Sequence, residues 1–215
     1  MIPCMSQNKI VAAPQQKRSQ ATLERLLNAT IRSLAEHGLE GTVIPRIAAL
    51  AEVAPASVYR RFVNKDALMR AAFLHLLERS NEANKSQLPA MLRHPTLRAS
   101  ADALIRLMFL QYRQHPRLLR ALARFIDADT DTAFVAAARA IMEENVQLSV
   151  QCLLVHRGQI RHASPERALQ FAVLHAITSI EAIALEPMSL WHNVIPEPDE
   201  KLAEELVRSF VAYLS

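Results

Sequence analysis

Apolar residues recur at spacings of three and four along most of the 215-residue chain, which is typical of amphipathic helices. From Thr22 to His37 they share one face, while charged and amide side chains occupy the other. Gly38 is expected to end this helix, because glycine accepts the left-handed backbone conformation that other residues resist. Thr42 is expected to cap a short second helix, whose buried side begins at Ile44.

A third short helix and a long fourth helix follow. Pro55 suits the first helical position, because its ring presets a helical backbone angle and its missing N–H would have no partner there. Val58 and Phe62 are four residues apart, so they are expected to point together into a core. Asn64 is expected to cap the fourth helix, which continues to about Ser86.

Prolines, a glycine and clustered aspartates punctuate the pattern beyond Pro89 and separate five further helices, which makes nine in all. No alternating pattern is long enough to predict a strand. With only 3 glycines and 51% hydrophobic residues, the composition also favours helix. The predicted fold class is therefore all-α, with an N-terminal three-helix head of helix-turn-helix type and a larger C-terminal helical body. The five later helices are expected at 97–114, 117–126, 131–156, 165–186 and 199–214.

Positive charge gathers at one end of the chain. Through Asp66 there are nine basic and five acidic residues, a difference of +4, which equals the formal net charge of the whole chain. The remainder is neutral in sum, so the sequence indicates a cationic head for a polyanion and a body with another task. The alternative is an ordinary solvated basic surface. The expected parts are a flexible arm at 1–18, a helix-turn-helix domain at 19–66 and a body at 67–215.

Several classes of protein are disfavoured. Cys4 and Cys152 are far apart and match no disulfide framework or metal spacing, which fits a reducing cytoplasm. No apolar run is long enough to cross a membrane, and the start of the chain does not resemble a secretion signal. Cys152 and His156 share a helical face, but no third catalytic partner is recognisable. We therefore expect no enzyme, no metal site and no cofactor.

Residues 19–73 resemble the DNA-binding region of the TetR family of bacterial transcriptional regulators. The matching stretch is LLNATIRSLAEHGLEGTVIPRIAALAEVAPASVYRRFVNKDALMRAAF. Two positions depart from the family pattern. Glu52 stands where the family usually has the glycine of the turn, and Ala54 replaces the usual Ser or Thr cap of the third helix. The turn is therefore expected to carry some backbone strain, and Pro55 to offset part of the lost cap.

The resemblance implies roles in DNA binding for particular residues. Those expected to contact phosphates are Thr42, Tyr59, Lys65 and, with less specificity, Arg61. Those expected to face base edges or the adjoining backbone are Pro55, Ala56, Ser57 and Arg60. The partner would be a double-stranded, near-palindromic operator.

The resemblance also implies a homodimer and a small-molecule effector. Pairing helices 165–186 and 199–214 with their symmetry mates would form a four-helix bundle, and the alternative is a monomer that buries both helices internally. The expected dimer interface is Phe171, Ile180, Leu202, Leu206, Phe210 and Leu214. The candidate effector contacts, each of which could instead be plain core or surface, are Phe109, Tyr112, Arg113, Phe125, Phe134, Met142, Phe171 and His175.

The predicted function is a ligand-responsive DNA-binding regulator that represses transcription and is released by an inducer. The first alternative is a helix-turn-helix regulator whose body binds a protein partner or no ligand. The second is an all-helical enzyme.

Overall fold

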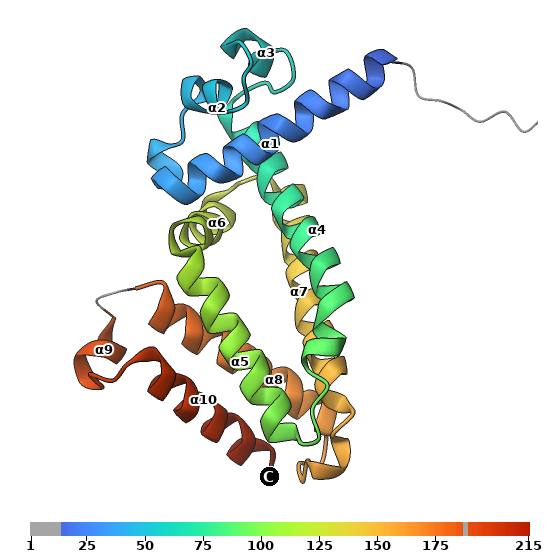
Figure 1. The fold of residues 1–215 in the computed structure, drawn as a ribbon, viewed down its shortest axis with the longest axis vertical. Helices are drawn as coiled ribbons and strands as arrows, with labels where there is room; N and C mark the ends of the chain where they lie inside the picture. Colours follow the sequence, from blue (N-terminus) through green and yellow to red (C-terminus); the bar gives the residue numbers. More distant parts are fainter. Residues whose placement is uncertain (1–13, 187–188) are drawn as a thin grey trace, which may run out of the picture.

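The computed structural model describes residues 14–186 and 189–215, and these form ten α-helices and one short 3-10 helix. Figure 1 shows the first three helices at one end of the long axis and the C-terminus near the other. Within the described ranges there is no strand, which agrees with the predicted all-α class. The elements are α1 (Pro14–Gly41), α2 (Ile44–Leu50), α3 (Pro55–Tyr59), α4 (Lys65–Met91), α5 (Leu97–Gln114), α6 (Pro116–Ala128), α7 (Thr132–Leu154), η1 (Arg157–Gln159), α8 (Pro165–Ala184), α9 (Leu190–Val194) and α10 (Asp199–Leu214).

The head consists of α1, α2, α3 and the first turns of α4. Its core gathers Leu26 of α1, Ile47 of α2 and Val58 of α3 against Leu68 and Ala72 of α4. Helices α2 and α3 are too short to be stable alone. Burial of these side chains therefore holds them against α1 and α4. The predicted boundary at residue 66 therefore falls just before residues that complete the head's core.

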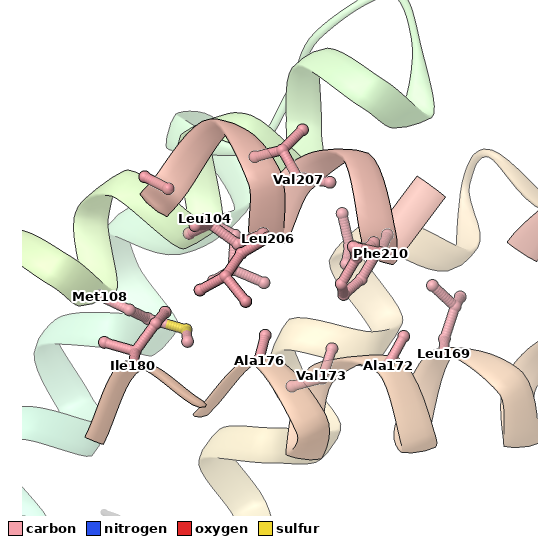
Figure 2. Close-up of a cluster of buried hydrophobic side chains, with 14 of the residues drawn as sticks. Leu104, Met108, Leu169, Ala172, Val173, Ala176, Ile180, Leu206, Val207 and Phe210 are labelled. Carbon is pink, nitrogen blue, oxygen red and sulfur yellow. The ribbon is translucent and has the colours of Figure 1, made fainter. Parts of the chain in front are cut away.

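The body is built around α5, α7, α8 and α10. Figure 2 shows α10 lying over α8, with Leu206 and Phe210 directed at Ala172, Val173 and Ala176. The small alanine side chains let the two helices approach closely, and the larger side chains fill the space between them. This contact lies within one chain, which matters for the dimer considered below.

A third apolar cluster joins the head to the body. Leu34 of α1 and Phe73 of α4 pack there with Leu122 of α6 and Phe134 of α7. Phe125 lies between two of these rings, with centroids 5.2 Å from Phe73 and 5.7 Å from Phe134. Head and body are therefore connected by packed aromatic and aliphatic side chains.

Polar contacts reinforce the same junction. The Arg70 guanidinium donates two hydrogen bonds of 2.8 Å to the two carboxylate oxygens of Asp129, which lies just after α6. The Arg117 guanidinium donates a 2.7 Å hydrogen bond to the carbonyl of Glu36 in α1. Because both contacts are charge-assisted, they fix the orientation of α6 and α4 relative to the head.

Most helix bounds agree with the sequence prediction, and α5 and α10 match it residue for residue. Gly38 has a φ of 66°, as expected for a helix stop, although the helix resumes for one further turn to Gly41. Residues 14–18 are helical in α1, so that part of the predicted flexible arm is wrong, and residues 1–13 lie outside the described structure. The short helix α9 was not predicted.

The fourth helix is longer than expected. It continues through Pro89 to Met91, even though proline removes a helical hydrogen bond and crowds the preceding turn. Leu88 and Leu92, on either side of the proline, are both buried in the core of the body. Their burial offsets the local cost, so tertiary packing decides the helix end.

Candidate DNA-binding surface and effector cavity

The third helix turns one face into the head and the other to solvent. Val58 is buried and Phe62, just past the helix, packs against the same core, as predicted. On the opposite side Tyr59 is 60% exposed, and Arg60 and Arg61 are exposed beside it. The helix thus presents an aromatic ring and two guanidinium groups outward from a rigid base.

Pro55 begins α3 at its first position, and Ala54 precedes it in extended conformation without a side-chain cap. Both observations agree with the sequence prediction. Pro55 and Ala56 are exposed, and Ser57 is partly exposed. The start of the helix is therefore open to a large partner, with no bulky side chain in front of it.

The turn between α2 and α3 has the geometry of a helix C-terminal motif. The N–H of Glu52 donates to the carbonyl of Ala49, and the N–H of Val53 donates to the carbonyl of Ala48. These are the two hydrogen bonds of a Schellman motif, in which the residue at the Glu52 position is left-handed. Glu52 has a φ of 55° and is the one non-glycine residue with positive φ in the described ranges, so the predicted strain is present.

A shallow hollow separates α3 from the start of α1. Arg61 donates a 3.1 Å hydrogen bond to the hydroxyl of Ser19 across it, and Arg60 donates one of 2.8 Å to the hydroxyl of Ser57. Thr22 also lines the hollow. Neither arginine has a carboxylate partner within the described part of the chain, so both charges remain available to an anion. The sequence analysis missed Ser19 and Thr22, whose position beside α3 depends on tertiary packing.

Two of the predicted phosphate contacts have other roles in the structure. Thr42 is fully buried, and its hydroxyl donates to the Gly38 carbonyl and accepts from Ser33. The cap position of α2 is Val43, so the predicted cap is wrong. The Lys65 ammonium donates to the carbonyl of Leu39 at 3.1 Å, so it joins α4 to α1. A phosphate contact by either side chain would require these internal bonds to break.

The body contains a partly open cavity of about 630 Å³ between α4, α5, α6, α7 and α8. Leu104 and Met108 of α5 and Leu122 of α6 form part of an apolar wall. Its polar lining consists of uncharged groups, including Gln111 and Tyr112 of α5, and one carboxylate, Glu143. Volume and lining are those of a small-molecule site.

Two of the predicted effector contacts, Tyr112 and Met142, line this cavity. The other six do not. Phe109, Phe125 and Phe134 are packed in the apolar clusters of the core. Arg113 instead donates hydrogen bonds to Asp199 and to the carbonyl of Ala184, while Phe171 and His175 stack on the exposed side of α8.

The cavity also has lining residues that the sequence analysis missed. They are chiefly amides, and Asn84 donates a 2.8 Å hydrogen bond to Asn145 while Gln170 donates one of 3.4 Å to Gln147. Amides at inward-facing helical positions could have indicated the cavity from the sequence, because a buried amide needs a hydrogen-bond partner or a ligand.

Comparison with known proteins places this geometry in a family. Residues 26–72 match the bacterial regulatory proteins of the tetR family. The chain carries a TetR-family DNA-binding head. No curated protein sequence is similar enough to the chain to count as a match.

Solved structures extend the likeness to the TetR fold of the body. A protein from Mesorhizobium loti assigned to the TetR-family transcriptional regulators has a TM-score of 0.67 at 18% identity, covering 92% of this chain and 96% of that one. FadR from Bacillus subtilis, in complex with stearoyl-CoA, has a TM-score of 0.63 at 15% identity, covering 89% and 99%. A TetR regulator from Haloarcula marismortui has a TM-score of 0.63 at 20% identity, covering 91% and 97%.

The chain is thus a DNA-binding regulator with a TetR-type helix-turn-helix head. TetR-family regulators are non-enzymatic transcription factors, which agrees with the prediction that this chain is not an enzyme. Cys152 and His156, predicted to share a helical face, have different surroundings. His156 is buried with its Nε2 2.9 Å from the Ser100 hydroxyl, and burial raises the pKa of the Cys152 thiol, which disfavours the reactive thiolate. Within the described ranges, no helix combines the length and hydrophobicity needed to span a membrane.

The predicted dimer residues of this TetR-type chain need correction. Five of the six are buried inside the single chain, because the apolar faces that contain them pack α8 and α10 against each other and against α5. The five are Ile180, Leu202, Leu206, Phe210 and Leu214. Only Phe171 remains accessible, with 57% of its surface exposed.

An exposed apolar strip does run along the outer side of the same two helices. Leu174, one turn from Phe171 on α8, is 50% exposed, and Tyr213 of α10 is 43% exposed. The rings of Phe171 and Tyr213 lie 5.1 Å apart and therefore connect the two helices at the surface. His175 stacks on Phe171 with centroids 6.2 Å apart. We call Phe171, Leu174, His175 and Tyr213 the outer strip.

Proposed function

We propose that this TetR-type regulator is a repressor that binds a near-palindromic operator as a homodimer and is released when a small molecule occupies the body cavity. A location in the cytoplasm, where bacterial operators are accessible, is part of the proposal. The observation that carries it is the outward face of α3, where Tyr59, Arg60 and Arg61 stand exposed on a packed base without carboxylate partners. A helix with this presentation fits the major groove.

Within that face we assign base reading to Arg60 and positioning to Tyr59 and Arg61. Arg60 can donate two hydrogen bonds to guanine once its hydrogen bond to the Ser57 hydroxyl is broken. Ala56, at the start of the helix, can pack against the methyl group of thymine. Arg61 and the Ser19 hydroxyl are 3.1 Å apart, so both can approach one phosphate. Pro55 and Ser57 would contact the adjoining bases or backbone. Thr42 and Lys65 contribute through the packing of the helices that hold α3.

We propose the outer strip as the core of the dimer interface. Three large side chains, Phe171, Leu174 and Tyr213, remain half exposed on neighbouring helices, where a partner would remove them from water. Pairing α8 and α10 with their symmetry mates across this strip forms a four-helix bundle. A twofold dimer would place the two α3 helices about 34–36 Å apart, one turn of DNA, and so match a near-palindrome.

Release by an effector rests on residues shared between the cavity and the junction. Leu77 of α4 and Leu122 of α6 line the cavity, and both belong to the cluster that packs against Leu34 of the head. A bound molecule that displaces α6 would also disturb the Arg117 bond to α1. By linkage, the effector lowers operator affinity only if it binds the DNA-incompetent arrangement more tightly.

The FadR structure from Bacillus subtilis holds stearoyl-CoA, which supports a ligand role for a body of this fold. The second candidate is a regulator whose body binds a protein partner. The cavity favours the small molecule, since a protein partner needs no apolar cavity of this volume.

The test begins with selection of bound sequences from random double-stranded DNA, followed by affinity measurements on the enriched sequence. Arg60→Ala is expected to cost about 1–3 kcal/mol per half-site while circular dichroism and mass stay unchanged. Arg93→Ala, at an exposed arginine of the body, is the matched control. Equal affinities of Arg60→Ala and the parent protein would exclude this face as the reader. Sedimentation should give twice the chain mass, and a monomer on operator DNA would contradict the dimer.

A further inference from the structure

The lining of the body cavity includes one acidic side chain and no basic side chain. Of its nineteen lining residues, eleven are aliphatic or methionine, seven are polar without charge, and one, Glu143, carries a carboxylate. No lysine, arginine or histidine is among them. A site for an anion normally supplies at least one cation or a cluster of free N–H donors, because an unpaired buried charge costs several kcal/mol.

Two of the cations near the cavity, Arg113 and Arg117, are engaged elsewhere. Arg113, next in sequence to the lining residue Tyr112, is held by Asp199 through a 2.7 Å hydrogen bond and by the carbonyl of Ala184 at 3.1 Å. Arg117 reaches away to the Glu36 carbonyl in α1. The third, Arg120 of α6, has a buried Nε without a hydrogen-bond partner in the described residues, but it lies outside the lining, which includes its neighbours Leu119 and Leu122.

Most of the polar groups in the lining are also occupied. The side-chain amides of Asn84 and Asn145 bond to each other, and Gln170 bonds to Gln147. Gln111 and Tyr112 are lining residues whose side chains make no hydrogen bond within the described residues, and Tyr112 brings a hydroxyl. Burial, and to a lesser extent the negative charge of Glu181, raises the pKa of Tyr112 to about 12, so the hydroxyl remains a neutral donor.

From this lining we infer that the effector is an amphiphile with an apolar body and a polar end that is uncharged or cationic, seated with that end at Tyr112. Carboxylates and phosphates are disfavoured, because the lining offers them no counter-charge and its one charged side chain is the carboxylate of Glu143. A hydroxyl or an ammonium group would instead meet the Tyr112 oxygen and, for the ammonium, favourable charge. This inference rests on the proposed function, since it takes the cavity as the effector site.

The experiment uses three probes with the same ten-carbon chain: decyltrimethylammonium, decanol and decanoate. Each is titrated calorimetrically into the full-length protein at pH 7, below its aggregation concentration. We expect the ammonium and the alcohol to bind at least tenfold more tightly than the carboxylate. Equal or tighter binding of decanoate would overturn the inference, and so would the absence of binding by all three.

Variants locate the effect in the cavity. Leu107→Trp fills part of the cavity and is expected to abolish binding of every probe without changing helical content. Glu143→Lys is expected to improve decanoate binding about two- to fivefold, the strength of a half-exposed ion pair. The matched control is Glu78→Lys, an exposed position of α4 outside the lining. An equal gain from the control would refute a local origin of the preference.

Failure of this inference can be told apart from failure of the proposed function. Operator affinity is measured on the same preparations without any probe. If decanoate binds best while the protein still binds the operator, the assignment as a DNA-binding regulator is kept and only the proposed class of effector is refuted. If the protein does not bind the selected DNA at all, the proposed function is refuted, whichever probe binds best.

Discussion

Replacing Glu52 with glycine should stabilise the protein. Glu52 occupies the left-handed position of the Schellman motif that ends α2, with a φ of 55°. For a residue with a Cβ this conformation costs roughly 1–2 kcal/mol. Glycine avoids that cost, but it loses about 0.5–1 kcal/mol through the greater freedom of the unfolded chain. The expected net gain is about 0.5–1 kcal/mol.

The gain should be visible in thermal unfolding followed by circular dichroism. For a chain of this length, 1 kcal/mol shifts the midpoint by about 2–4 °C, so Glu52→Gly should raise Tm by about 1–4 °C. Urea unfolding should show a higher midpoint with an unchanged slope.

The control is Glu52→Ala, which removes the same charge and keeps the Cβ. If the strain argument is right, alanine gives little or none of the gain. If alanine stabilises as much as glycine, the penalty comes from the carboxylate and the backbone reasoning is refuted. Because both variants raise the net charge equally, any electrostatic gain in DNA affinity should appear in both.

Three further predictions concern other parts of the molecule. Asn64→Ala removes the side chain that caps α4 by accepting from the Ala67 N–H, and should cost about 1 kcal/mol in urea unfolding. Phe171→Glu should convert the dimer to a monomer in sedimentation, and an unchanged mass would exclude the outer strip. The Arg70 guanidinium lowers the pKa of Asp129, so this carboxylate stabilises the fold above its ordinary pKa of about 3.9 and loses that effect as pH falls through the lowered value. Asp129→Asn should therefore cost about 1–2 kcal/mol at pH 7, and its difference from the parent should vanish in acid.

Local backbone chemistry was predictable from the sequence. Gly38 takes the positive φ expected of it, and Pro55 starts α3 as expected, while the strain at Glu52 was implied by the family resemblance. These outcomes depend on a few neighbouring residues and their steric limits, which the sequence contains. Periodicity also identified Val58 and Phe62 as inward-facing, because one helical face follows from spacing alone.

Partners in space were not predictable in the same way. Periodicity showed that Leu206 and Phe210 face an apolar neighbour, but it cannot say whether that neighbour is in the same chain or a second copy. Thr42 had the right residue type for a cap, yet the kink at Gly38 directs its hydroxyl inward. In the body, Phe109, Phe125 and Phe134 fill the core, while Tyr112, amides and leucines border the cavity, so aromatic character alone does not identify a lining residue.

The continuity of α4 limits how this regulator can be recombined with others. One 27-residue helix supplies Leu68 and Ala72 to the head and Leu88 to the core of the body, with no flexible linker between. A chimaera joined at residue 66 would leave the head without two of its core side chains. A junction beyond Ala72 would keep the head whole, but the new body must then accept Phe73 against its own α6. Exchange of operator specificity among such proteins is therefore easier by changing the surface of α3 than by exchanging whole domains.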